Sequence, residues 1–98
     1  MAKKFVQIVQ YETDDIDESL EITKEFLEAT EGKRASGRGV TCADRDNPDR
    51  YFTIVEFDSH EDAQKNNDLP ETQGMADKQM KNSKGEPTFY NLDVLFEA

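Results

Sequence analysis

The chain has no tryptophan, one histidine and one cysteine, and these shortages exclude several kinds of site. A single cysteine, Cys42, cannot form a disulfide within the chain. One histidine with scattered carboxylates gives no spacing typical of a metal site. Cys42 lies in a strand-like run, and we expect it to be a small core residue rather than a nucleophile. The sequence therefore predicts neither an internal disulfide nor a bound metal.

Long hydrophobic runs and positive charge are also scarce. No run approaches the roughly 20 apolar residues of a membrane-spanning helix, and the opening segment is too polar for a signal peptide. The net charge is −10, from 22 acidic and 12 basic residues, which argues against binding to nucleic acid or to an anionic membrane. We expect an acidic, cytoplasmic protein that binds neither partner.

The remaining composition fits one domain over residues 1–98 with a limited core. Hydrophobic residues make up 35% of the chain, which is lean for so small a monomer. A core shared between two copies is therefore an attractive arrangement.

Runs of β-branched and aromatic residues predict four strands, separated by turn and helix signals. The expected strands are Phe5–Tyr11, Gly39–Arg45, Arg50–Phe57 and Thr88–Phe96.

The first helix is expected to follow Asp15, which forms a capping pattern with Glu18, and to end at Gly32. Its expected buried stripe follows helical spacing. The residues of that stripe are Ile16, Leu20, Thr23 and Leu27, with Phe26 beside them.

A second helix is expected in two pieces. Ser59 with Asp62 is typical of a helix start, and the first piece runs to about Asn67. Pro70 disfavours helix at the residue before it but suits the first turn of a new piece. The apolar side of that second piece is expected to carry Leu69, Thr72, Met75 or Ala76, and Met80.

The order β-α-β-β-α-β is that of the ferredoxin-like fold, a four-stranded antiparallel sheet with helices on one face. The first strand, however, is apolar on both faces, with Phe5 and Val9 on one and Val6 and Ile8 on the other. Because helices cover only one face, we expect the second to meet the same face of another copy, as a homodimer.

The stretches "YFTIVEFDSHEDA", "NNDLPETQ" and "PTFYNLDVLF", with this element order, resemble the dimeric α/β-barrel superfamily, and within it the antibiotic-biosynthesis-monooxygenase-like domains. The resemblance implies two ferredoxin-like subunits packed sheet to sheet into a barrel, each with a pocket between its sheet and helices. Activities in that superfamily include cofactor-independent oxidation of aromatic polyketides, heme degradation, and conversion of small ring compounds.

The residues argue against the heme-degrading members. By rough register Gln7 occupies the position of their strand amide, but Asn66 stands where they carry tryptophan and Ala76 where they carry the iron-binding histidine. His60, the only histidine, is expected to be exposed at a helix start. We therefore expect no heme and no other cofactor.

A cofactor-free oxygenase stays open. That chemistry needs a substrate that forms a stabilised carbanion and reduces oxygen itself, while the protein supplies a dry cavity, a proton acceptor and polar donors. The family often carries histidine at the position of Asn66, and asparagine cannot serve as a base there. The candidate pocket residues are Gln7, Tyr11, Tyr51, Asn66, Asn67, Met75 and Tyr90.

Structural roles compete with each of these assignments. Asn66 and Asn67 suit a helix C-terminus, and Gln7 suits a satisfied polar position in the barrel interface. Met75 and the tyrosines suit ordinary packing. The sequence leaves two functions open. The first is an enzyme or binder that takes a small aromatic or apolar ligand, and the second is a non-catalytic dimeric carrier or accessory module.

Overall fold

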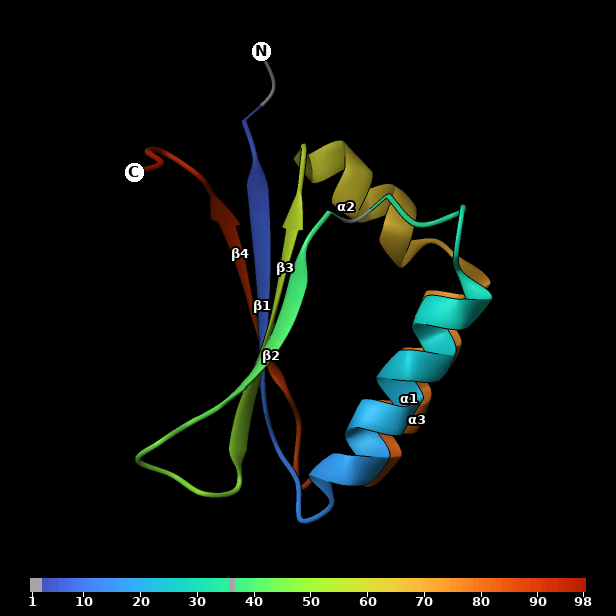
Figure 1. The fold of residues 1–98 in the computed structure, drawn as a ribbon, viewed down its shortest axis with the longest axis vertical. Coiled ribbons are helices and arrows are strands. Elements are labelled where there is room, and N and C mark those ends of the chain that lie inside the picture. The colour runs from blue at the N-terminus through green and yellow to red at the C-terminus, as the bar shows by residue number, and fades with distance from the viewer. Residues whose placement is uncertain (1–2, 36) are drawn as a thin grey trace.

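The structure is a computed structural model that describes residues 3–35 and 37–98. Within these residues, the elements follow one another in the order β-α-β-β-α-α-β, as shown in Figure 1. The elements are β1 (Phe5–Glu12), α1 (Ile16–Ala29), β2 (Gly39–Ala43), β3 (Arg50–Phe57), α2 (His60–Asn67), α3 (Pro70–Asn82) and β4 (Thr88–Asp93).

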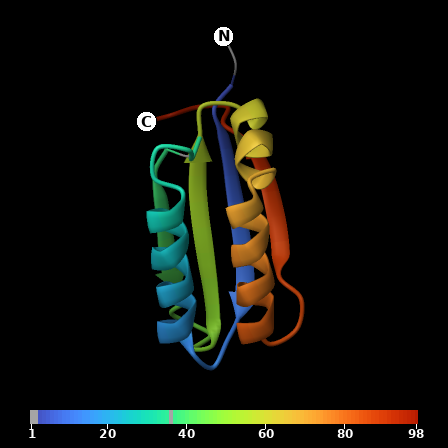
Figure 2. The ribbon, with the colours of Figure 1, turned by 90° about the vertical axis from the view of Figure 1, so that its right-hand side faces the viewer.

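The four strands form one antiparallel sheet in the order β2-β3-β1-β4. All three helices lie over the same face of this sheet, and Figure 2 shows α1 and α3 side by side in front of it. The ferredoxin-like prediction is confirmed, with the second helix divided into α2 and α3. No helix in the described part of the chain is long and apolar enough to cross a membrane.

Local chemistry sets where the helices begin. Asp15 Oδ1 accepts a hydrogen bond from the Glu18 amide at 3.1 Å, and Ser59 Oγ accepts one from the Asp62 amide at 3.2 Å. Pro70 is the first residue of α3 and follows an extended Leu69. These three predicted helix starts are confirmed. Asn66 and Asn67 lie at the C-terminus of α2, as their alternative structural role predicts, although the C-cap residue itself is Asp68.

The buried face of α1 differs from the expected stripe. Ser19 and Ile22 are buried, whereas Leu20 and Leu27 are 38% and 43% exposed. The reason is that α1 packs sideways against α3 as well as over the sheet, so that part of its buried face points toward α3. In α3 the same geometry leaves Met80 exposed at 52%.

The end of β4 and the environment of Cys42 also need correction. β4 ends at Asp93 rather than Phe96, because Asp93 already pairs with Phe5, the first residue of β1. Phe96 is 86% exposed. Cys42 is exposed rather than in the core, because it pairs with Phe52 on the sheet face away from the helices.

Alternation along the strands gives the sheet two faces, the inner face toward the helices and the outer face away from them. The inner face meets the helices at Phe5, which forms the main core cluster with Phe57 and with Ala63 of α2. The outer face carries an apolar surface that no part of the described chain covers, and Val40, Tyr90 and Leu92 on it are exposed. This face also carries Val6, Ile8, Phe52 and Ile54.

Candidate functional site

The inner face of the two central strands is the starting point for a site. Phe5 contacts α2, and Tyr11 Oη lies 3.3 Å from Ser19 Oγ of α1, so both ends of β1 meet the helices through odd-numbered residues. Gln7 and Val9 lie between them on the same face. Their partners across β3 are Val55 and Thr53, and Tyr51 lies opposite Tyr11.

The middle of this inner face is incompletely packed. Phe5 and Phe57 are buried, but the inner-face residues between them and the far end of the strands are only half-buried, although β1 and β3 are central strands. In a fully packed sandwich, such positions would be enclosed by helix side chains. The middle of the inner face is therefore less buried than the end that carries Phe5 and Phe57.

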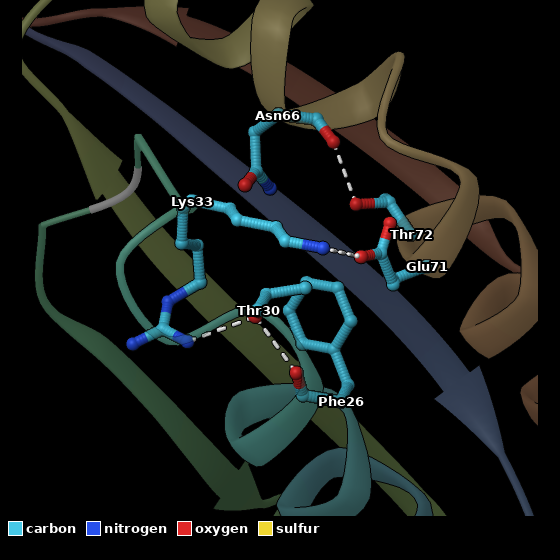
Figure 3. Close-up of polar contacts among 7 residues, drawn as sticks. Phe26, Thr30, Lys33, Asn66, Glu71 and Thr72 are labelled. Carbon is cyan, nitrogen blue, oxygen red and sulfur yellow. Dashed lines mark hydrogen bonds and ion pairs between the residues drawn. The ribbon is translucent and has the colours of Figure 1, made fainter.

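Asn66 of α2 is the most unusual polar residue on this side of the molecule. It is 8% exposed, and its Oδ1 atom is buried without a hydrogen-bond partner among the described residues. Figure 3 shows its carboxamide pointing away from α2, toward Lys33 and the segment that follows α1. A buried polar atom without a partner costs about 1–3 kcal/mol, so a protein keeps one only where something offsets that cost.

The segments around Asn66 are held together by polar contacts that do not use its side chain. Thr72 Oγ1 donates to the Asn66 carbonyl oxygen at 2.6 Å, which fixes α3 against the end of α2. Lys33 Nζ and Glu71 Oε2 form an ion pair at 2.8 Å between the segment after α1 and the start of α3 (Figure 3). Lys33 lowers the pKa of the Glu71 carboxyl through this contact.

At the other end of β1, a polar cluster joins α1, α3 and the sheet. Ser19 Oγ donates to Gln79 Oε1 at 2.8 Å, and Gln79 Nε2 donates to the Ser19 carbonyl at 3.0 Å and to Thr23 Oγ1 at 3.2 Å. Ser19 is fully enclosed, with 1% exposure. Tyr11 is half-buried beside it, and its ring centroid lies 6.0 Å from that of Tyr51.

The residues predicted from the sequence to line a pocket do not all lie in one place. Gln7, Tyr11 and Tyr51 lie on the inner face, and Gln7 Nε2 donates to Asn91 Oδ1 of β4 at 3.3 Å. Asn67 is exposed at the end of α2. Tyr90 lies on the outer face, where its hydroxyl donates to Gln10 at 3.2 Å.

Met75 lines an open groove of about 250 Å³ between α1 and α3. Its apolar walls are Ile22, Phe26 and Ala29 on one side and Gly74 and Met75 on the other. The groove lies at the seam between the two helices rather than on the sheet. Its rim is charged, with Glu25, Glu71 and Lys78.

Ser19, Gln79 and Asn91 also belong to this side of the molecule, and the sequence does not single them out. Ser19 and Thr23 stand four residues apart, as do Met75 and Gln79, so each pair shares one side of its helix. That spacing is the only signal that could have indicated them. We define the interior site as Gln7, Tyr11, Tyr51, Asn66 and Gln79.

The interior site offers amide and hydroxyl groups. Within residues 3–35 and 37–98, no group of three or more histidine, cysteine, aspartate or glutamate side chains is placed to hold a metal ion. Such a set of neutral polar groups can orient a ligand by hydrogen bonds, and the half-buried apolar residues beside it can contact an aromatic or aliphatic surface.

Solved structures with this fold include oxygenases. The chain is similar to SnoaB, a cofactor-independent oxygenase from Streptomyces nogalater, with 12% sequence identity and a TM-score of 0.77. The match covers 99% of this chain and 97% of SnoaB. It is also similar to a provisionally assigned antibiotic biosynthesis monooxygenase from Nitrosomonas europaea, with 15% identity, a TM-score of 0.81, and 98% and 94% covered. A conserved protein from Methanosarcina mazei gives 9% identity, a TM-score of 0.80, and 92% and 91% covered.

Sequence comparison adds no relative: no protein-family model and no curated protein matches the chain. At sequence identities this low, the structural similarity supports the assignment of the fold but does not show that this chain catalyses the same reaction. The chain has the fold of the antibiotic biosynthesis monooxygenase-like proteins.

Proposed function

We propose that the protein binds a small aromatic or apolar molecule at the interior site and oxidises it without a cofactor, in the manner of a monooxygenase. The observation that carries the proposal is the buried, unpartnered Oδ1 of Asn66. A ligand that donates a hydrogen bond to this atom would remove a cost of about 1–3 kcal/mol that the free protein bears.

The incompletely packed inner face supports the same proposal. Val9, Thr53 and Val55 are half-buried in the middle of the sheet, where a flat apolar ligand would complete their burial. Polar groups stand at both ends of this strip, with Asn66 near the Phe5 end and Tyr11 at the other. A few polar groups around apolar walls are the usual make-up of a small-molecule site.

In such an oxygenase the substrate itself reduces oxygen after losing a proton. Because no side chain of the interior site accepts a proton near neutral pH, that proton would go to solvent water before the substrate anion is enclosed. The interior site would orient the substrate and hold the developing enolate through the amide of Gln7 and the hydroxyls of the tyrosines. Enclosure between sheet and helices would keep water away from the reactive intermediate.

We further propose that the protein works as a homodimer joined through the outer faces of its sheets. Val40, Tyr90 and Leu92 expose apolar surface there, next to Val6 and Ile54. A second copy of the same face would bury this surface symmetrically. The interior sites would then lie on the two outer layers of the assembly, each between one sheet and its own helices.

A binding screen tests the first proposal. Aromatic compounds such as 1-naphthol should raise the melting temperature of the protein in a saturable manner, because a ligand that binds only the folded state stabilises it. Asn66→Ala should reduce the rise, whereas Asn67→Ala, which changes an exposed neighbour, should leave it intact. No saturable shift with any aromatic probe, or equal shifts in both variants, would count against the interior site.

A non-catalytic ligand carrier is the second candidate, and the make-up of the interior site favours it. Its five side chains are amides and phenols, and none is a carboxylate or an imidazole that could accept a proton near neutral pH. An oxygen electrode separates the two functions. Oxygen uptake with a bound, easily oxidised phenol indicates an oxygenase, and binding without uptake indicates a carrier.

A further inference from the structure

Gly74 stands inside α3 although nothing in the described chain requires a glycine there. Glycine is among the least favourable residues in a helix interior, because it loses the most backbone freedom on folding. Gly74 is the fifth residue of Pro70–Asn82, and it lacks the positive φ of Gly32 and Gly85. Apart from its own helix backbone and its two chain neighbours, a β-carbon on Gly74 would meet no atom of the described chain within 4 Å. Neither backbone conformation nor packing therefore explains this glycine.

The space beside Gly74 belongs to the groove of about 250 Å³ between α1 and α3. Phe26 of α1 and Met75 of α3 line this groove and are half-buried, and the two helices run side by side there (Figure 2). An aromatic ring can lie directly on the bare backbone of Gly74, with its edge toward the sulfur of Met75. The groove is smaller than the roughly 300–1,000 Å³ of a drug-sized pocket, so its ligand has one or two rings.

The charges that line the groove favour a cation. They are Glu25, Glu71 and Lys78, which leaves one negative charge in excess. Lys78 Nζ lies 3.5 Å from Glu25 Oε2, so these two charges largely cancel and Glu71 supplies the excess. The net charge of the whole chain, −10, also attracts cations and repels anions at longer range.

Glu71 is the most enclosed of these three charged side chains. It is 25% exposed, against 66% for Glu25 and 63% for Lys78. Its present partner, Lys33, comes from the segment after α1 and is 60% exposed (Figure 3). An ion pair with so exposed a lysine contributes little to stability. The ammonium group of a ligand can therefore replace Lys33 at Glu71 at little cost.

We infer that the groove between α1 and α3 is a second binding site, for a small aromatic amine: the ring lies on Gly74 between Phe26 and Met75, and the ammonium group pairs with Glu71. This site lies at the seam of the two helices and shares no residue with the interior site. It therefore does not depend on the proposed function, and it assigns the groove a binding role without a reaction.

Three naphthalene compounds of nearly the same shape test the class of ligand. At neutral pH 1-naphthylmethylamine is a cation, 1-naphthalenemethanol is neutral and 1-naphthoate is an anion. Each is titrated at low salt into isotope-labelled protein, and the backbone amide NMR signals report both the dissociation constant and the place of binding. The amine should shift the signals of Gly74 and Met75 saturably. It should bind about two- to fivefold more tightly than the alcohol, the range of one exposed ion pair, and naphthoate should bind most weakly.

Two substitutions separate the roles of the carboxylate and the glycine. Glu71→Gln should remove the preference for the amine over the alcohol. Glu28→Gln, which removes the same charge from an exposed position of α1, should keep that preference. Gly74→Leu should abolish the binding of both compounds, because its side chain occupies the place of the ring. Leucine favours a helix more than glycine does, so circular dichroism and the melting temperature should show that this variant is folded.

Each part of the inference can fail by itself. Equal binding of the amine and the alcohol, or a preference that survives Glu71→Gln, would overturn the role of Glu71. Amine binding that survives Gly74→Leu, or the absence of any saturable shift at Gly74, would overturn the groove as a site. None of these results decides the interior site, because 1-naphthol binding with Asn66→Ala tests that site, and Gly74→Leu should leave its Asn66-dependent part unchanged.

Discussion

The substitution Asn66→Ala is expected to make the folded protein more stable, although it removes a buried side chain. The carboxamide oxygen is buried with no hydrogen-bond partner in residues 3–35 and 37–98, and relieving that cost gains about 1–3 kcal/mol. Alanine in place of asparagine in a helix adds roughly 0.5 kcal/mol. A methyl-sized void in place of the amide costs about 1 kcal/mol. The backbone carbonyl that accepts from Thr72 is kept.

The net gain expected for Asn66→Ala is therefore roughly 0.5–2.5 kcal/mol in the free energy of unfolding. Asn67→Ala is the matched control. It lies in the same turn of α2 and gains the same helix propensity, but its side chain is exposed, so only about 0.5 kcal/mol is expected.

Urea unfolding followed by circular dichroism at one fixed protein concentration measures both variants, because the stability of an oligomer depends on concentration. With a slope of about 1–3 kcal/mol per molar urea, the two midpoints should differ measurably. An Asn66→Ala protein that is less stable than the Asn67→Ala protein would refute the reasoning, since it would mean that the Asn66 side chain has a favourable partner in the free state.

Three further predictions concern the outer face, an ion pair and heme. The wild type should sediment as the proposed dimer. Ile54→Asp on the outer face should give a monomer near 11.2 kDa, whereas Glu21→Gln on α1 should not, and a monomeric wild type would contradict the proposal. Lys33→Ala should raise the pKa of Glu71 toward its ordinary value of 4.5 in an NMR titration. Because the pKa of Glu71 is lowered in the folded state, its ion pair with Lys33 stabilises the protein at neutral pH and loses that effect as pH falls below 4.5. A Glu71 pKa that Lys33→Ala leaves unchanged would contradict the pairing. Added heme should give no saturable Soret shift, because Ala76 occupies the expected position of an iron ligand; a tight one-to-one complex would contradict this.

The elements that the sequence predicts well are those whose signals are local. The strand Arg50–Phe57 is a β-branched and aromatic run between turn residues, and its bounds agree with the structure. Pro70 marks the start of α3 because a proline fixes its own backbone and that of its neighbour, whatever the tertiary surroundings.

The positions that the sequence misplaces depend on neighbours far along the chain. The buried side of α1 was assigned from its leucines, but Ser19 is buried instead because Gln79, 60 residues away, satisfies its hydroxyl. Tyr90 was predicted to line the pocket but lies on the outer face, opposite to that of its neighbour Asn91. The alternation of residues along a strand shows that there are two faces but does not show which of them the helices cover. When two polar residues are buried against each other, neither adds to the hydrophobic pattern of the sequence, so the pattern does not predict their burial.

The distribution of contacts along β1 explains how the sheet can be held to its helices while the middle of its inner face stays half-buried. The apolar cluster of Phe5 with Phe57 and Ala63 ties the sheet to α2 at one end. The cluster of Tyr11 and Ser19 with Gln79 ties it to α1 and α3 at the other, six residues or roughly 20 Å further along the strand.

Between these two attachments, the sheet needs no close contact with the helices to keep its position. The central inner-face residues can stay half-buried, and their contacts remain free for a ligand. In the proposed dimer, burial of Val40, Tyr90 and Leu92 on the outer face would supply stability that the half-buried middle of the inner face does not. The proposed dimerisation through the outer face and the proposed binding at the inner face would then be two parts of one arrangement: burial on one side of the sheet would let the other side remain available for a ligand.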